Sequence, residues 1–380
     1  MRNIRLKKKK LLYILLALVL VYAVWLGYNL LRFEKYMFPV SSAGSHEVIG
    51  AYHVHTTFSD GQKHPDKIAK RASSASLDFI ILTDHGSPNY ECLQSQGWKE
   101  GVLVLAGSEL SVSRGHMVGL AFQKPPFTFS QNAEEAARQI DALEGFSIIS
   151  HPYSKTSWTW GESFPYHGLE IINSDAMLKT NFFSTLPYLP ALLVRPEYTL
   201  LKMIDYPLKN LEKWDDLNNH HIIYGYFSVD AHFLYKPLFS LLRLHLLLKK
   251  PLSSDFQEAG DQVYDTLRKG KFYNAIDAAA DPSGFRYSAK KNEKIRPMGE
   301  ILMLDSPVTL RIKTPFPFAK EVHLIHNGNT ILRSPKKRIS FKTKNPGTYR
   351  VEVYLKEKTP LNKNVPWIVS NPIFLREDKQ

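Results

Sequence analysis

Short motifs that combine histidine with acidic residues run in order through the first two thirds of this sequence. Neutral imidazole and ionised carboxylate are the side chains that hold zinc, manganese and iron in proteins. Nine such groups exceed the needs of one tetrahedral ion, so we expect two or three divalent ions (Zn, Mn or Fe) in one site. Clustered divalent ions in turn indicate hydrolysis by a metal-activated water. The nine candidate metal ligands are His53, His55, Asp60, His85, Glu109, His116, His151, Asp230 and His232.

The candidate ligands lie almost entirely at the ends of short apolar runs. Such runs are typical of buried strands, because they are short and rich in β-branched or aromatic residues. Polar segments with helical spacing, at 65–74 and 131–143, separate several of them. This alternation predicts an α/β domain with parallel strands, in which the chemistry gathers at the carboxyl ends of the strands. The predicted strands cover residues 48–52, 77–82, 102–105, 146–149 and 222–227.

The order of the motifs resembles the PHP family, the polymerase and histidinol phosphatase metallohydrolases. The resemblance covers roughly residues 47–290, including flanking stretches at 168–173 and 267–273. It implies a distorted seven-stranded β/α barrel, (β/α)7. The six motifs are His53-Val54-His55 with Asp60, Thr83-Asp84-His85, Gly107-Ser108-Glu109, Gly115-His116, His151-Pro152 and Asp230-Ala231-His232.

The same resemblance implies three metal positions and a phosphoesterase that cleaves a phosphate mono- or diester. Catalysis is expected from Glu109, Asp230 and His232. The residues leave open a hydrolase of a carbamate, amide or carboxyl ester, and a non-catalytic envelope-binding protein that keeps its metals. The implied ligand sets are His53, His55, Glu109 and Asp230; then Asp60, His85 and His232; then His116 and His151, with Glu109 bridging.

Two further residues near the motifs have open roles. Arg114 could clamp an anionic oxygen as a catalytic residue, because its planar guanidinium suits bidentate contacts, but a solvated loop charge fits equally. Asp84 is either a ligand or a residue that orients His85. The aromatic residues that follow His151 are expected to wall the mouth of the site; they are Tyr153, Trp158 and Trp160.

The other histidines do not fit the pattern of the candidate ligands. The pair His220 and His221 precedes a predicted strand and therefore lies at its wrong end. We expect surface or core roles for these residues, which are His46, His64, His167, His220, His221, His245, His323 and His326.

The N-terminal sequence is typical of a membrane anchor. Six positive charges in residues 1–10 precede the uncharged apolar segment 11–31, which as a helix is about 30 Å long and matches a bilayer core. The charge bias places the N-terminus in the cytoplasm and the catalytic domain outside it. The alternative is a cleaved signal peptide, but its apolar region is usually shorter, and no small-residue cleavage site follows here. We therefore expect a single-pass signal anchor in the cytoplasmic (inner) membrane.

Charge and cysteine content exclude several classes of protein. Residues 1–10 contribute +6 and residues 311–380 contribute +10 to a total of +13, so the middle is slightly acidic. A nucleic-acid enzyme needs its basic surface near the site, so nucleic acid is not expected as a partner. The single cysteine, Cys92, rules out an intrachain disulfide and a thiolate metal site.

The C-terminal segment 300–380 shows alternating strands separated by turn signals, such as 327–329 and 345–347. We expect an immunoglobulin-like β-sandwich, whose basic surface either contacts anionic lipid or is simply solvated. The expected organisation is therefore a cytoplasmic segment 1–10, a transmembrane helix 11–31, a linker 32–46, a PHP domain 47–295 and the sandwich 300–380.

Two apolar segments, 174–219 and 233–250, are additional to the strands and helices that a minimal barrel requires. Neither is long or uniform enough for a second membrane span. Each could be an amphipathic lid on the bilayer or an ordinary core helix. The substrate is thus expected to be a phosphorylated small molecule or a lipid-linked compound.

Overall fold

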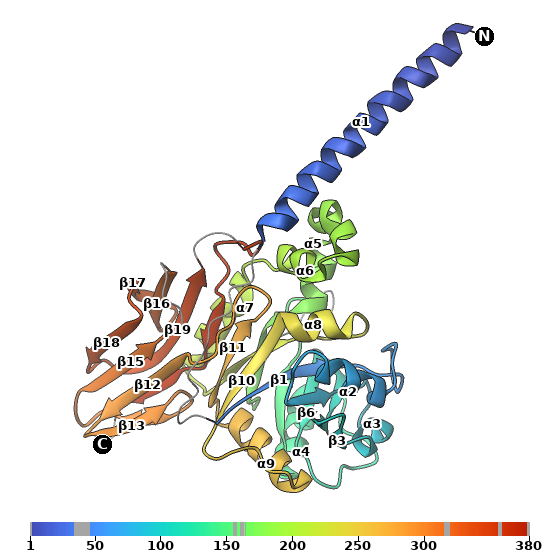
Figure 1. The fold of residues 1–380 in the computed structure, drawn as a ribbon. Helices are drawn as coiled ribbons and strands as arrows, with labels where there is room; N and C mark the ends of the chain where they lie inside the picture. Colours follow the sequence, from blue (N-terminus) through green and yellow to red (C-terminus); the bar gives the residue numbers. More distant parts are fainter. Residues whose placement is uncertain are drawn as a thin grey trace.

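The computed structural model describes residues 2–33, 46–154, 158–159, 163, 165–314, 320–355 and 359–377. Most of the expected linker 32–46, and Trp160, lie outside these residues. Figure 1 shows three parts: a long N-terminal helix that projects from the body, a mixed α/β domain, and a β-rich C-terminal region.

The N-terminal helix α1 (Arg2–Arg32) exposes its large apolar side chains from Leu11 to Val24. Only its last part contacts the body of the protein, where Leu26 is buried. By length and composition it is the one helix among the described residues that could cross a membrane, although a signal sequence would have the same properties.

The first sheet has β1 at its centre and supplies the amino-terminal motifs. Strands β1, β2 and β4 are parallel and connect through α2 (Pro65–Ser73) and α3 (Tyr90–Gln94). Strand β10 runs antiparallel to both of its neighbours, β1 and β11. In order across this part of the sheet, the strands are β3 (Gly97–Lys99), β4 (Val102–Ala106), β2 (Phe79–Leu82), β1 (His46–Val54), β10 (Leu242–Leu248) and β11 (Phe272–Ile276).

The second sheet of the α/β domain is partly antiparallel, which departs from the uniformly parallel arrangement expected from the sequence. Its first two strands form a hairpin whose connection is too short for a parallel crossover. The third strand pairs antiparallel with the second. The fourth strand pairs parallel with the third, and the fifth pairs parallel with the fourth. The strands are β5 (Ser108–Val112), β6 (Gly115–Leu120), β7 (Phe146–Ile149), β8 (Gly168–Asn173) and β9 (Tyr224–Ser228).

The two sheets meet at the ends of their strands. Gly107 joins β4 to β5, and a Cβ atom there would lie 2.2 Å from the carbonyl oxygen of Gly119, so only glycine fits this bend. Isolated parallel bridges pair Val54 with Ala231 and His85 with Glu109. The ends of β1, β2 and β9 and the start of β5 therefore converge on one region.

The two extra apolar segments take different forms. The first is helical: α5 (Ser174–Thr185), the 3₁₀ helix η1 (Leu186–Leu193), α6 (Pro196–Met203) and α7 (Leu208–Asn218). The second forms the short helix α8 (Tyr235–Leu241), which buries Leu238 and Phe239 as a core helix does, and then strand β10, which neither alternative had included. Two helices pack on the remaining sheet surfaces, α4 (Ala133–Ala142) and α9 (Phe256–Arg268).

The C-terminal region consists of two facing sheets, and its first strands begin before residue 300. The Tyr287 hydroxyl donates to the Tyr349 carbonyl at 3.1 Å and so links the two layers. One sheet contains β13 (Lys294–Pro297), β12 (Arg286–Lys291), β15 (Val308–Lys313) and β18 (Arg338–Thr343). The other contains β17 (Asn329–Ser334), β16 (Lys320–His326), β19 (Gly347–Leu355), β20 (Ile368–Ser370), β21 (Ile373–Arg376) and β14 (Ile301–Met303). Strand β20 also pairs with β11, so this sheet is continuous with the first sheet of the α/β domain.

Candidate metal centre

The structure brings all nine predicted ligands together where the two sheets meet. Each lies within hydrogen-bonding or ligand-sharing distance of at least one other. His53 is on β1 and His55 follows it, with Asp60 in the next loop. The others are His85 after β2, Glu109 on β5, His116 on β6, His151 after β7, and Asp230 and His232 after β9.

The deepest part of the site is formed by His53, His55, Glu109 and Asp230, which are 0–5% exposed. The Nε2 atoms of His53 and His55 lie 3.4 and 3.2 Å from Asp230 Oδ1, and both lie 3.3 Å from Glu109 Oε2. Ligands of a tetrahedral zinc ion, each about 2.05 Å from the metal, are about 3.3 Å apart. His53, His55 and Asp230 therefore form one candidate metal shell, and Glu109 contacts two of its imidazoles from a neighbouring group.

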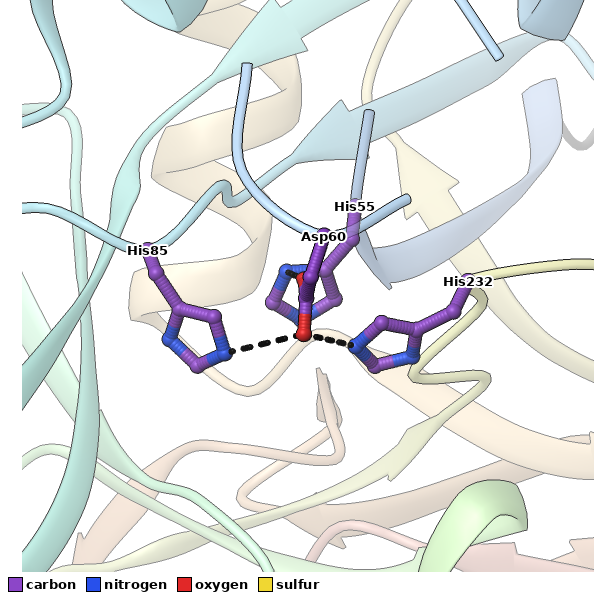
Figure 2. A group of neighbouring side chains, drawn as sticks. All are labelled: His55, Asp60, His85 and His232. Atoms are coloured by element: carbon purple, nitrogen blue, oxygen red, sulfur yellow. Dashed lines mark ion pairs between the residues drawn. The ribbon is translucent and has the colours of Figure 1, made fainter. Parts of the chain in front are cut away.

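A second group lies nearer to solvent and consists of His55, Asp60, His85 and His232 (Figure 2). Asp60 Oδ2 lies between two imidazoles, 3.2 Å from His232 Nε2 and 3.7 Å from His85 Nε2. Asp60 is 53% exposed, so this group opens to the outside. The grouping matches the second metal position implied by the PHP resemblance, with His55 added.

His116 and His151 are arranged differently from the third implied ligand set. Both face Glu109 Oε1, at 3.3 and 3.0 Å. However, the ligand atoms cluster as His85, Glu109 and His116 on one side and as His53, Glu109 and His151 on the other. Glu109 is shared by both clusters, as expected for a bridging carboxylate.

The unpaired polar atoms of the site fit divalent metal ions. Nε2 of His53 and of His55, Nδ1 of His116 and Oδ1 of Asp230 are buried and make no hydrogen bond within the described part of the chain. Buried polar groups are rarely left without a partner, and a cation satisfies all four. The donor set of imidazoles and carboxylates is also that of zinc, manganese and iron.

The electrostatics of the site lead to the same conclusion. Burial alone would lower the pKa of His53, but Asp230, Glu170 and Glu109 raise it well above its usual value. Burial would likewise raise the pKa of Glu109, but His53 and its other imidazole neighbours hold it well below its usual value. The carboxylates thus stay ionised and favour positive charge among the histidines, which either protons or metal ions supply.

Three of the ligands have strained backbones. The φ angles are 69° at His53, 27° at His151 and 43° at Asp230, in the left-handed region that non-glycine residues rarely adopt. Each such residue costs about 1–3 kcal/mol, and such strain gathers at functional sites. The surrounding sheet ends hold these side chains in position at the expense of stability.

Glu170 and Asn173 on β8 support the ligands, although the sequence reasoning gave them no role. Glu170 Oε1 lies 2.6 Å from His53 Nδ1, and Oε2 accepts from the backbone N–H of His151 at 2.8 Å. The Asn173 amide donates to Glu170 at 2.9 Å and to Asp230 at 3.0 Å. These contacts fix the orientation of three ligands. The only signal in the sequence was the family-like stretch 168–173.

Asp84 does not orient His85. Its carboxylate accepts from the Thr56 backbone N–H at 2.7 Å, the Thr56 hydroxyl at 2.9 Å and the Ser59 hydroxyl at 2.6 Å. It therefore fixes the turn between His55 and Asp60. It belongs to none of the ligand groups within the described residues.

A cavity of about 910 Å³ opens above the ligands and is lined by α5 as well as the site. Arg114 does not line it, and its guanidinium pairs with Glu134 at 2.9 Å, so of the two roles left open by the sequence the structure favours a loop charge over an anion clamp. Among the described residues, the lysine that lines the cavity is Lys179 on α5, and it forms an ion pair with Asp175, which also lines the cavity. Tyr153 lines the mouth as expected, whereas Trp158 is buried elsewhere, against Tyr166.

The remaining histidines stay outside the ligand groups of the described chain, and His220 and His221 do not line the cavity. His245 is fully buried on β10 between Glu47, at 3.0 Å, and Asp277, at 3.0 Å. Burial would lower its pKa, but the two carboxylates raise it to about 9. Burial would raise the pKa of Glu47, but hydrogen bonding to His245 and nearby positive charges lower it to about 2. This ionic cluster is a satisfied part of the core.

Residues 51–235 match the PHP domain. This match confirms the resemblance seen in the sequence: the chain carries a PHP domain, which with the ligand clusters supports a metal-dependent hydrolase that binds divalent ions. No curated protein sequence matches the chain.

Three solved structures are similar. A two-domain protein from Bacteroides vulgatus that contains a predicted PHP-like metal-dependent phosphoesterase has 14% identity and a TM-score of 0.46, over 89% of this chain and 99% of that one. An amidohydrolase from Chromobacterium violaceum has 16% identity and a TM-score of 0.32, over 48% and 87%. A candidate metal-dependent phosphoesterase from Bifidobacterium adolescentis has 14% identity and a TM-score of 0.32, over 57% and 95%.

Proposed function

We propose that this protein is a membrane-anchored, extracytoplasmic phosphoesterase that uses two or three divalent ions to cleave a phosphate mono- or diester. The observation that carries the proposal is the position of Glu109. Its two oxygens lie 3.0–3.3 Å from five imidazoles, those of His53, His55, His85, His116 and His151. A single carboxylate whose two oxygens both face several imidazole ligands is suited to bridging metal ions in a multinuclear centre.

The chemistry that divalent ions supply in such a centre is activation of water and neutralisation of charge on phosphate oxygens. His53, His55 and Asp230 would hold the innermost ion, and Asp60, His85 and His232 the outer one. His116 and His151 would complete the shells around Glu109. Lys179 on the cavity wall pairs with Asp175 and would exchange that partner for a phosphate oxygen, which is the role the sequence analysis considered for Arg114.

The PHP resemblance also suggests finer features of the fold. With β4 and β5 counted as one bent strand joined by Gly107, the order β1, β2, β4–β5, β6, β7, β8 and β9 has seven members. Together with a bridge from the end of β9 back to the end of β1, it supports a distorted (β/α)7 barrel. Two facing sheets after residue 286 support an immunoglobulin-like sandwich. The charge bias around α1 supports an anchor whose catalytic domain is extracytoplasmic.

Metal content and substrate class test the proposal together. Full-length protein purified without chelators or added metal should contain at least two transition-metal ions per chain by elemental analysis. It should then be assayed on p-nitrophenyl phosphate, bis-p-nitrophenyl phosphate and a carbamate ester.

Hydrolysis of either phosphate ester supports the proposal. Hydrolysis of the carbamate alone identifies a carboxyl-type hydrolase instead. Full metal loading without turnover of any substrate indicates a metal-containing binding protein, and less than one metal equivalent refutes the metal centre.

A further inference from the structure

The helical segment beside α1 presents an apolar surface to the outside. Phe183 at the end of α5 is 82% exposed, and Leu193 and Val194 at the end of η1 are 91% and 79% exposed. The η1 sequence, Leu-Pro-Tyr-Leu-Pro-Ala-Leu-Leu, contains no charged residue. Large apolar side chains that are exposed together mark an interaction surface.

This surface is attached to the predicted membrane helix. The Tyr22 hydroxyl of α1 donates to the Pro187 carbonyl of η1 at 2.7 Å, and the rings of Trp25 and Tyr188 are 5.7 Å apart. At the end of α1, Arg195 donates to the Leu30 carbonyl at 2.6 Å. These contacts hold η1 along the last turns of α1. Figure 1 shows α5 and α6, the helices before and after η1, beside the same end of α1.

The contact with Tyr22 sets the depth of η1. Tyr22 lies about 14 Å along the helix from Leu31, at 1.5 Å per residue. The apolar segment 11–31 is about as long as a bilayer core is thick, so Tyr22 lies near the middle of the bilayer when α1 spans it. The Pro187 carbonyl, which accepts from Tyr22, then lies at a similar depth, and η1 runs from there through the outer leaflet toward Arg195. An apolar, uncharged η1 suits that position, and Arg195 suits the leaflet surface, where the end of α1 emerges.

The same segment forms the wall of the candidate active site. Helix α5 begins directly after Asn173, and seven of its residues, between Asp175 and Phe183, line the cavity. The polar floor carries the metal ligands, whereas Leu178, Phe182, Phe183 and Phe233 supply an apolar rim. One helix therefore connects the proposed catalytic centre to the surface that faces the bilayer.

We infer that η1 and the end of α5 insert into the outer leaflet and that the cavity receives its substrate from the membrane surface. The substrate class that fits is an amphiphile: a phosphate ester whose head reaches the metal ligands and Lys179 while its apolar tail lies against the aromatic rim. The substrate part of this inference rests on the proposed phosphoesterase activity, whereas the membrane contact rests on the proposed membrane-spanning anchor and not on the activity.

Depth measurement on the full chain in liposomes tests the membrane contact without any turnover. The only cysteine, Cys92, is fully buried, so a nitroxide can be attached selectively to Leu193→Cys. Ile295→Cys is the matched control, because Ile295 is 61% exposed on the distant strand β13. The label at residue 193 should collide with dissolved oxygen more than with a water-soluble nickel chelate, and the label at residue 295 should show the reverse. Equal behaviour of the two labels overturns the inference, as does shielding of residue 193 by a second copy of the chain.

Substrate presentation is tested by a ratio of activities. Turnover of a long-chain phosphate ester in vesicles is divided by turnover of soluble p-nitrophenyl phosphate. In Phe183→Ser and Leu193→Ser this ratio should fall about tenfold, which corresponds to losing one buried apolar side chain. Ile295→Ser and Ile331→Ser, exposed on the C-terminal sheets, should keep the wild-type ratio.

An unchanged ratio in Phe183→Ser and Leu193→Ser refutes membrane presentation while leaving the phosphoesterase intact. Failure of metal-loaded wild type to cleave either ester refutes the proposed function and the substrate class together. In that case the depth measurement alone decides the membrane contact.

Discussion

Replacing Glu170 with glutamine should weaken metal binding although Glu170 is not itself a predicted ligand. The carboxylate is fully buried and contacts His53 Nδ1 with one oxygen, while the other accepts from the His151 backbone and the Asn173 amide. Glutamine offers one acceptor and one donor group in place of two acceptors. No orientation of the amide can satisfy all three neighbours.

The two orientations fail in different ways. With its oxygen toward His53, the glutamine NH₂ faces two donors, and each unsatisfied buried donor costs about 1–3 kcal/mol. With its NH₂ toward His53, the imidazole must carry its proton on Nε2, the atom that faces Asp230 and Glu109. A protonated nitrogen cannot bind a metal, so we expect metal affinity to fall about 10–100-fold, which is about 1.4–2.7 kcal/mol.

The measurement is competition with a chromophoric chelator on metal-stripped full-length protein, combined with thermal unfolding. The control is Glu352→Gln, which removes a similarly buried carboxylate from its Arg350 partner, far from the ligands. The control should lose stability and keep its metal affinity. If Glu170→Gln binds every ion with wild-type affinity, the orienting role assigned to Glu170 is wrong.

Three further outcomes are expected. Glu109→Gln should lower turnover at least about 10–100-fold, because ligand loss exceeds the cost of losing a supporting residue. His220→Ala and His221→Ala should stay near wild-type turnover, and equal rates for all three variants would contradict the assigned mechanism. Glu47→Gln should destabilise the fold near pH 6 by less than the about 3–5 kcal/mol of a buried charge left without any partner, because Asp277 still pairs with His245. The pair stabilises fully between about pH 4.5 and 6.5. Stability is lost as pH falls toward the lowered Glu47 pKa of about 2 and as it rises through the raised His245 pKa of about 9. Urea titrations that give the same difference from wild type at pH 6 and pH 3 would disprove this. A reporter fused after residue 380 should be active only outside the cytoplasm, and cytoplasmic activity would reverse the proposed topology.

The sequence was sufficient to locate the candidate ligands because strand ends converge in an α/β domain. His53, His85 and Asp230 each follow a short apolar run, and the structure places those runs as β1, β2 and β9 with adjoining ends. The spacing of residues within a motif is a local property of the sequence. It therefore does not depend on which distant strands pair with each other. The PHP resemblance, carried by these same motifs, is confirmed by the match to residues 51–235.

Features that depend on pairing between distant segments could not be predicted in this way. Residues 242–246 alternate leucine with Arg243 and His245, as a strand does, but the sequence analysis grouped them with the apolar residues before them. Pairing with β1 and β11 makes them part of β10. Arg114 was a reasonable anion clamp by charge, but its direction is set by Glu134 on α4. Glu170 lies inside a buried strand without a motif of its own, so its contact with His53 becomes visible only in three dimensions.

The pairing of β20 with β11 also affects how the protein is made. Strand β11 lies beside β10, which lies beside β1, so the sheet that carries His53 keeps an open edge at β11 until residues 368–370 have been synthesised. An open edge of this kind invites pairing with other chains. A chain that emerges N-terminus first must therefore protect this edge until its last strands arrive. Protein shortened before β20 should accumulate as aggregates rather than as a free catalytic domain.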